Sequence, residues 1–274
     1  DPQEIIDGAK EAQKELLSGF GGHPSAITEL KNESKTVKHV ALSLTGEPIN
    51  YPKINEIINL FHKEKISTFL VTNGQYPEEL KDLPPITQLY ISLDAPSKEI
   101  LKKVSQPLFT DHWERLNKSL EYLSEKKERT CLRFTLMREI NMCDLEGYSK
   151  LIQKADPDFL EIKAYMFVGS SRQRLDLKNM PFHEDMVNFS KALVKYLPDY
   201  EIVAEHIPSR IVLLAKKKYK KNGKWHTWID FDKFFNKEED YSRETPETGL
   251  SGKGTKERMK VDEKTEELEF WKED

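Results

Sequence analysis

The stretch 37-VKHVALSLTGEPINY-51 decides the fold. Its first eight residues are dense in Val, Ala and Leu, which is typical of a buried strand, and the strand ends at the turn Thr45-Gly46-Glu47-Pro48. Glu47 therefore places a carboxylate at the carboxyl end of a strand. Because ligands bind at that end in barrels and open α/β sheets, the turn is a candidate site.

The same order of strand and helix repeats along the chain. The predicted strands are 37–44, 67–71, 88–93, 130–137 and 159–166, and the predicted helices are 1–17, 53–65, 76–83, 110–127, 144–155 and 180–197. A repeat of roughly 35 to 45 residues is typical of βα units with a parallel sheet. Right-handed connections curl such a sheet, so we expect an α/β fold with a barrel or partial barrel.

The pattern changes after residue 197. Residues 200–204 and 211–215 are predicted strands with no helix between them, and 219–229 contains Asn222-Gly223, a strong hairpin signal. From residue 237 the chain is charged and poor in apolar residues. We therefore expect a barrel with a C-terminal hairpin over 1–236 and a solvated, flexible tail over 237–274.

Composition limits the class of protein. The 274 residues carry a net charge of −4, and no apolar run approaches the roughly 20 residues of a membrane span, so we expect no membrane partner. Cys131 and Cys143 are the only cysteines, which favours free, buried or half-buried thiols in a reducing compartment such as the cytoplasm. No Cys or His cluster has metal-binding spacing, so no metal ligand is predicted in this chain.

The predicted strands and the turns after them bring a set of polar groups to the carboxyl ends of the strands. They are Thr45, Glu47, Thr72, Asn73, Ser92, Asp94, Arg133, Glu161 and Lys163. Glu47 is suited to accept hydrogen bonds from an ammonium group, and Gly46 lets a ligand approach the backbone. Asp94 and Asn73 are suited to ribose hydroxyls. Lys163 also permits a different interpretation, a Schiff-base lysine of an aldolase.

Two basic segments are candidates for phosphate binding. Gly169 to Arg174 presents backbone N–H groups beside Arg172 and Arg174. The hairpin carries Lys217, Lys218, Lys220 and Lys221 between aromatic residues. That combination suits RNA contact, although lysines also protect a solvated sheet edge.

Many ordered motifs together resemble one family. They are VKHVALSLTGEP (37–48), STFLVTNGQYPEEL (67–80), QLYISLDAP (88–96), QPLF (106–109) followed by Trp113, RFTL (133–136), Asn141-Met142, PDFLEIKAYM (157–166), GSSR (169–172) and KWHTWID (224–230). This set resembles the 4-demethylwyosine synthases, radical SAM enzymes of tRNA wybutosine biosynthesis.

The resemblance implies a partial (β/α) barrel, S-adenosylmethionine and a [4Fe-4S] cluster. The implied substrates are N1-methylguanosine of phenylalanine tRNA and a two-carbon unit of pyruvate, with an electron donor as a further partner. By position, Thr45, Gly46, Glu47 and Pro48 match the motif that holds the methionine amino group. Asn73, Ser92 and Asp94 match positions around the cofactor, and Arg133 and Lys163 match inner barrel residues of catalytic interest.

The chain departs from the family pattern in its cysteines. The family's Cys-x3-Cys-x2-Cys loop, the cysteines of a second cluster, the lysine for pyruvate and the first barrel strand have no counterpart here, and Gln106 replaces an expected arginine. In the family these features precede the helix that starts at Asp1, so we expect a chain that lacks the N-terminal part and is inactive alone. A cluster-free tRNA-binding protein on the same scaffold is the alternative.

Overall fold

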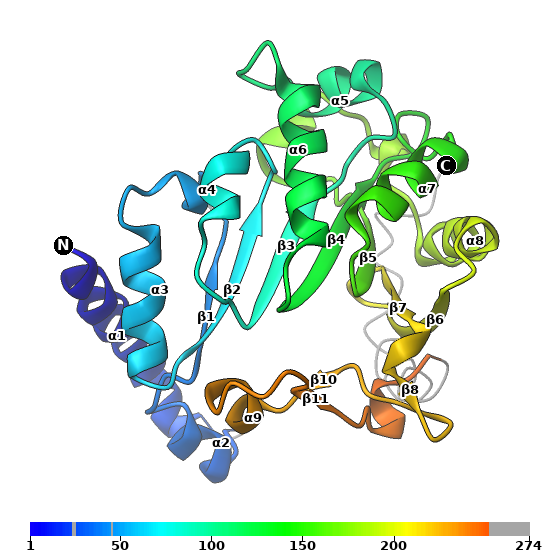
Figure 1. Cartoon of the computed structure of the whole chain (residues 1–274). Helices are drawn as coiled ribbons and strands as arrows, with labels where there is room; N and C mark the ends of the chain where they lie inside the picture. The colour runs from blue at the N-terminus through cyan, green and yellow to red at the C-terminus, as the bar shows by residue number, and fades with distance from the viewer. Residues whose placement is uncertain (24–25, 45, 252–274) are drawn as a thin grey trace.

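A curved sheet of seven strands forms the centre of the molecule within residues 1–23, 26–44 and 46–251, which the computed structural model describes (Figure 1). The strand order is β1-β2-β3-β4-β5-β7-β6. The strands are β1 (His39–Leu42), β2 (Ser67–Thr72), β3 (Gln88–Ser92), β4 (Arg129–Leu136), β5 (Phe159–Ala164), β6 (Tyr200–His206) and β7 (Ile211–Lys216). Strands β1 to β5 are parallel, and β7 and β6 add antiparallel pairs at the far edge.

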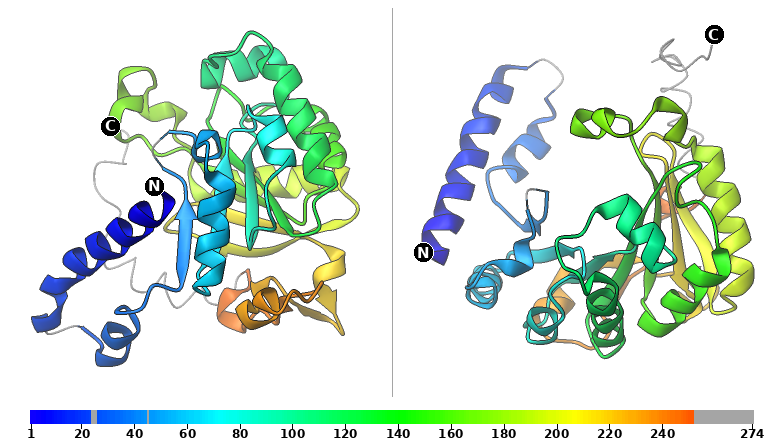
Figure 2. Two further views of the ribbon diagram at one scale, coloured as in Figure 1. Left: turned by 60° about the vertical axis from the view of Figure 1, so that its left-hand side comes forward. Right: turned by 90° about the horizontal axis from the view of Figure 1, so that it is seen from above.

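The helices are α1 (Pro2–Ser18), α2 (Thr28–Glu33), α3 (Ile54–Lys63), α4 (Pro77–Lys81), α5 (Lys98–Ser105), α6 (His112–Ser124), α7 (Leu145–Ala155), α8 (His183–Leu193) and α9 (Phe231–Phe235). Helices α3, α4, α6, α7 and α8 cover the outer side of the sheet, as the view from above shows (Figure 2), and α1 packs against α3. The predicted partial barrel and its strand–helix repeat are confirmed. Helices α2, α5 and α9 were not predicted; Ser97 caps α5, and its side chain accepts a hydrogen bond from the backbone N–H of Ile100.

Alternation along the strands separates a dry face from a polar one. Leu89, Leu132 and Leu160 are fully buried among the helices of the outer layer. Successive residues of a strand point to opposite faces of the sheet. The residues next to each of these leucines along its strand therefore lie on the concave face. That face carries the half-buried Arg133 and Glu161. The concave side therefore holds the polar groups that the sequence placed on these strands.

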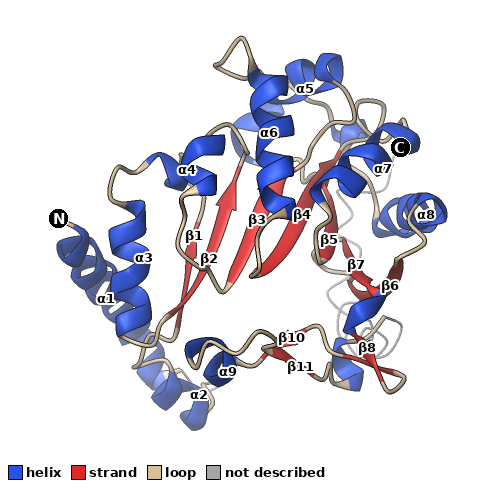
Figure 3. Ribbon diagram, in the orientation of Figure 1, coloured by secondary structure: helices blue, strands red, loops and turns tan. Residues whose placement is uncertain are grey.

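The C-terminal segment closes the end of the sheet opposite the strand carboxyl ends (Figure 3). Strands β8 (Lys220–Lys221) and β9 (Lys224–Trp225) form the predicted hairpin, with Asn222 and Gly223 at φ +50° and +78°. Strands β10 (Trp228–Ile229) and β11 (Ser242–Arg243) pair antiparallel. The chain arrives at this end because β7 runs antiparallel to β5, so that β7 finishes where β5 starts.

Residues 241–251 belong to this closure. Tyr241 is 6% exposed, and its hydroxyl accepts from the Arg129 backbone N–H at 2.8 Å and donates to the Thr87 carbonyl at 3.1 Å. The expectation of a solvated tail from residue 237 was wrong for this part, because a few apolar and hydroxyl side chains dock it. The rest of the predicted tail, 252–274, lies outside the described residues. In the described part of the chain, no helix has the length and apolar character needed to cross a bilayer.

Candidate functional site at the carboxyl ends of the strands

Glu47 lies after β1, and only one of its two carboxylate oxygens accepts a hydrogen bond within the described residues. Its Oε2 accepts a hydrogen bond from the Asn73 backbone N–H at 2.8 Å. Its Oε1 is buried and has no hydrogen-bond partner among the described residues. Burial raises the pKa of Glu47, although hydrogen bonds from Asn73, Thr72 and Ile49 oppose that rise. A buried acceptor of this kind fits a ligand that brings its own donor.

The turn that carries Glu47 leaves room for such a ligand. Gly46 has φ +74°, and nothing lies within 4 Å of the point where a Cβ would stand. Pro48 opens a short 3-10 helix, Pro48–Asn50, and the buried Ile49 anchors it. Thr45, which the sequence also assigned to this turn, lies outside the described residues.

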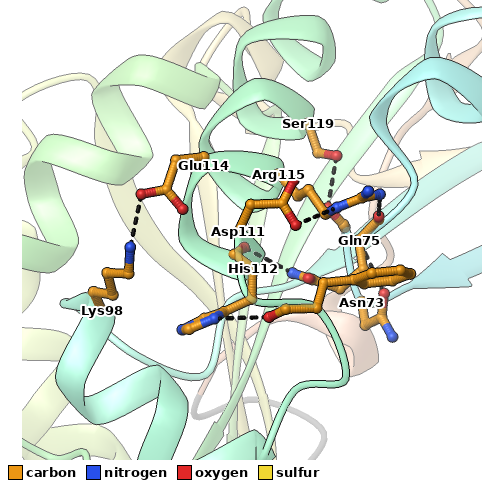
Figure 4. Close-up of polar contacts among 10 residues, drawn as sticks. Asn73, Gln75, Lys98, Asp111, His112, Glu114, Arg115 and Ser119 are labelled. Atoms are coloured by element: carbon orange, nitrogen blue, oxygen red, sulfur yellow. Dashed lines mark hydrogen bonds and ion pairs between the residues drawn. The ribbon is translucent and has the colours of Figure 1, made fainter.

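The end of β2 is fixed by a polar network on α6 (Figure 4). Asn73 Oδ1 accepts from the Gln75 backbone N–H at 2.9 Å, and Gln75 Nε2 donates to the His112 carbonyl at 3.1 Å. Arg115 donates to the Gln75 carbonyl at 3.1 Å, and Ser119 Oγ donates to the Gly74 carbonyl at 2.7 Å. Sequence reasoning missed these supporting residues, because they lie some 40 residues from Asn73 and share no motif with it.

Asp94 follows β3 and is tied to β4. Its Oδ1 accepts from the Thr135 backbone N–H at 2.8 Å, and its carbonyl accepts from Asn141 Nδ2 at 2.8 Å. Burial raises the pKa of Asp94 to about 6, against the hydrogen bonds from Thr135 and the charge of Arg133. Ser92 is half-buried and pairs in register with Arg133. Glu47 and Asp94 thus both stand at strand ends in sites that penalise their charged form.

Arg133, Glu161 and Lys163 occupy the concave face of β4 and β5. Arg133 Nε and Glu161 Oε1 lie 3.0 Å apart, although Arg133 Nε has no hydrogen-bond partner among the described residues. Burial and the neighbouring Arg133 lower the pKa of Lys163, while Glu161 opposes this effect. The sequence did not settle whether these side chains point inward. The structure places them together inside the barrel, and their catalytic role stays a prediction.

A cavity of about 510 Å³ continues from Glu161 toward the closed end of the barrel. Its wall includes Tyr90, Cys131, Phe159 and Trp228. Burial raises the pKa of the Cys131 thiol well above its ordinary value, so that thiol is a poor nucleophile.

The two basic segments lie at opposite ends of the molecule. Arg172 and Arg174 follow β5 at its carboxyl end, in and after the 3-10 helix Gly169–Gln173. The hairpin lies at the closed end, where Lys218, Lys220 and Lys221 form ion pairs with Asp158, Glu201 and Asp240 respectively. Lys217 lies beside them, and its backbone N–H donates to the Asp199 carbonyl. The structure therefore does not bring the hairpin lysines together with the strand-end groups.

The residues present do not fit an iron–sulfur cluster. Among the described residues no group of three or more His, Cys, Asp or Glu side chains is arranged to hold a metal ion. Cys131 is buried, whereas Cys143 is exposed rather than half-buried as the sequence suggested. Two cysteines in the whole chain cannot supply the three thiolates of a Cys-x3-Cys-x2-Cys loop.

Two family models match this chain. Residues 25–152 match the radical SAM superfamily, and residues 154–216 match the family described as wyosine base formation. Together they span the strands that carry the candidate site.

Similar proteins carry one function in their names. The chain is 47% identical over 236 residues to the S-adenosyl-L-methionine-dependent tRNA 4-demethylwyosine synthase TYW1 of Danio rerio, covering 85% of this chain and 32% of that protein. It is 44% identical over 263 residues to the synthase of Oryza sativa, covering 92% of this chain and 40% of that protein. The chain thus spans about a third of the length of the curated relatives it matches.

Two solved structures that resemble this chain are also of TYW1 proteins. A structure of TYW1 with a lysine–pyruvate adduct bound matches with a TM-score of 0.73 and 32% identity, over 81% of this chain and 72% of that one. Archaeal TYW1 matches with a TM-score of 0.69 and 32% identity, over 81% and 73%.

Proposed function

Since the chain belongs to the TYW1 family of radical SAM tRNA 4-demethylwyosine synthases, we propose that its concave sheet binds S-adenosylmethionine at the strand carboxyl ends. The observation that carries the proposal is the open, buried Oε1 of Glu47. The α-amino group of a methionine moiety is an ammonium, and it would supply the donor that this oxygen lacks. The space beside Gly46 admits such a ligand next to the backbone.

The remaining strand-end residues hold the rest of the cofactor in this proposal. Asp94 and Asn73 accept from ribose hydroxyls, and Ser92, which is half-buried at the end of β3, contacts the same cofactor. Pro48 follows Glu47 in the turn, and Thr45 is assigned to the same cofactor from its position in the sequence alone. Bound S-adenosylmethionine supplies the radical chemistry of this enzyme class. The part of these residues is to orient it and to keep water from the reacting carbon.

The proposed reaction joins N1-methylguanosine of phenylalanine tRNA to a two-carbon unit of pyruvate, giving 4-demethylwyosine, and it needs an electron donor. Arg133 and Lys163 face the interior where these substrates would meet. Their positive charges suit anionic or carbonyl groups of the substrates. We place the reaction in the cytoplasm, in keeping with two free thiols.

The 274 residues by themselves do not complete this reaction in our proposal, because the chain cannot hold the cluster. Anaerobic reconstitution with iron and sulfide should leave S-adenosylmethionine intact. Cleavage to 5′-deoxyadenosine by the chain as given would contradict this part of the proposal and leave the binding site untouched.

The binding site is tested with Glu47→Gln, which keeps the acceptor for Asn73 but loses the charge. The loss of one charge-assisted hydrogen bond corresponds to about 1.5–3 kcal/mol, or roughly 10- to 150-fold in Kd. Titration calorimetry with S-adenosylmethionine measures it. Glu56→Gln, on the exposed side of α3, is the matched control and should bind as the wild type does. Equal affinity of the Glu47 variant and the wild type would refute the assignment.

A cluster-free tRNA-binding protein on the same barrel is the second candidate, because it needs no cluster ligands and keeps the basic segments. It predicts RNA binding that neither S-adenosylmethionine nor Glu47→Gln changes. The first candidate predicts a cofactor affinity that depends on Glu47. Measuring both ligands on both proteins separates the two.

A further inference from the structure

Phe182 is an exposed aromatic side chain that lies beside two arginines. Its ring is part of a residue that is 40% exposed. The guanidinium carbon of Arg138 lies 4.8 Å from the ring centroid, and that of Arg210 lies 5.2 Å from it. Both arginines thus make cation–π contacts with one ring that still faces solvent.

This cluster lies on the rim of the barrel mouth. Arg138 follows the carboxyl end of β4, and Arg210 immediately precedes β7. The Arg210 carbonyl accepts from the backbone N–H of Ala164 at 3.0 Å, and Ala164 is the neighbour of Lys163 on β5. The cluster is therefore next to the strand end from which Lys163 faces the interior.

The cluster carries more positive charge than its own carboxylate balances. Arg138 pairs with Asp185 at 2.6 Å. Arg210 donates to the Pro181 carbonyl at 2.7 Å and has no ion-pair partner within 4 Å among the described residues. Burial and the neighbouring Arg138 lower the pKa of Arg210, while Asp185 opposes this. Because two neighbouring guanidinium groups share one carboxylate, this cluster has a net positive charge that favours binding of an anion.

A second arginine–aromatic pair lies on the connection between β5 and α8, which also carries Phe182. Arg172 is exposed, and its guanidinium carbon lies 5.2 Å from the centroid of Phe167. Arg174 is exposed two residues later. The hairpin at the closed end differs, because three of its lysines are already paired with carboxylates.

We propose that the rim formed by Arg138, Phe182, Arg210 and Arg172 binds the RNA strand beside the nucleotide that enters the barrel. The guanidinium groups contact phosphates, and the Phe182 ring stacks on an unpaired base. This rests on the proposed function for the identity of the ligand as RNA. Charge complementarity and an exposed ring select single-stranded RNA, because duplex RNA shows no base face to stack on.

The test is fluorescence anisotropy of a labelled RNA stem-loop with this chain, measured over a series of KCl concentrations. Arg210→Gln should weaken binding and lower the slope of log Kd against log salt by about 0.7 to 1, the value for one lost phosphate contact. Phe182→Ala should weaken binding by roughly 5- to 150-fold with an unchanged slope, because stacking releases no counterions.

Two controls keep the proposal falsifiable. Arg210→Lys keeps the charge and should retain the wild-type slope, which separates phosphate contact from a folding defect at this residue, whose φ is +49°. Replacing Lys217, Lys218, Lys220 and Lys221 with Ala should leave both affinity and slope near wild type. Loss of slope in this hairpin variant with normal rim variants would overturn the proposal, and so would a wild-type chain that does not bind the RNA.

The outcome is independent of the cofactor site. If S-adenosylmethionine does not bind while RNA binding still depends on Arg210 and Phe182, the cofactor assignment is refuted and the proposal for the rim is supported. If the cofactor binds through Glu47 and the rim variants bind RNA normally, the rim falls alone.

Discussion

Asp94→Asn should change how the stability of the protein depends on pH. The folded-state pKa of Asp94 is about 6, whereas an aspartate in an unfolded chain titrates near about 3.9. A carboxyl group whose pKa is raised on folding favours the folded state below about pH 4, and that contribution is lost as the pH rises through about 6. The difference of about 2 pKa units corresponds to about 3 kcal/mol.

Asparagine cannot ionise but keeps the oxygen that accepts from the Thr135 backbone N–H. The free energy of unfolding of the variant, relative to wild type, should therefore be near zero at pH 4. It should rise by up to about 3 kcal/mol in favour of the variant by pH 7. Urea denaturation followed by tryptophan fluorescence, at half-unit steps of pH, gives both curves. The difference cancels the titration of all other groups, since they are common to both proteins.

Asp240 provides a control of opposite sign. Burial acts to raise its pKa, but hydrogen bonds from the Lys221 side chain and from Ser242 outweigh burial and lower it. Asp240→Asn should therefore become less stable relative to wild type as the pH rises through the acid range. A flat difference for Asp94→Asn between pH 4 and pH 7 would refute the reasoning, and so would a slope of the same sign in both variants.

Three further changes probe the support of the site. Gly74→Ala should destabilise the chain by about 1–3 kcal/mol in urea denaturation, because residue 74 has φ +71° and a Cβ there would lie 3.0 Å from Leu116 Cδ1. Tyr241→Phe should cost about 1–3 kcal/mol, since the Arg129 N–H loses its acceptor in a buried place; an unchanged urea midpoint would contradict this. Borohydride with labelled pyruvate should label wild type and Lys163→Ala equally, and labelling lost in the variant would instead support the aldolase interpretation.

The layered fold could be predicted from local sequence because its signal is local. The alternation along 130–137 predicts a strand, and the apolar spacing in 53–65 predicts a helix. Both elements are confirmed. The docking of 241–251 could not be predicted this way. It depends on Tyr241 reaching the backbone of β4, and such a contact between distant residues leaves no periodicity in a charged segment.

The site was predicted unevenly for the same reason. Glu47 and Asp94 stand next to strand ends, so chain position alone indicates their place. Whether Arg133 and Lys163 face inward depends on register, which only pairing between strands fixes. Of the rim, only Arg172 was a candidate from the sequence. Arg138, Phe182 and Arg210 were missed because they come from separate connections, and none of them belongs to a motif.

Both ends of the barrel hold buried polar atoms without hydrogen-bond partners among the described residues. At the closed end, Lys218 and Lys221 of the hairpin are paired with carboxylates, whereas the buried Nη1 of Arg129 has no hydrogen-bond partner among the described residues. At the mouth, one oxygen of Glu47 and the Nε of Arg133 have no hydrogen-bond partner among the described residues. Buried polar groups without partners lower stability, so a ligand that supplies the partners must raise it. A ligand at 100 times its Kd stabilises the folded chain by about 2.7 kcal/mol, and this gain should follow the mouth residues rather than the hairpin.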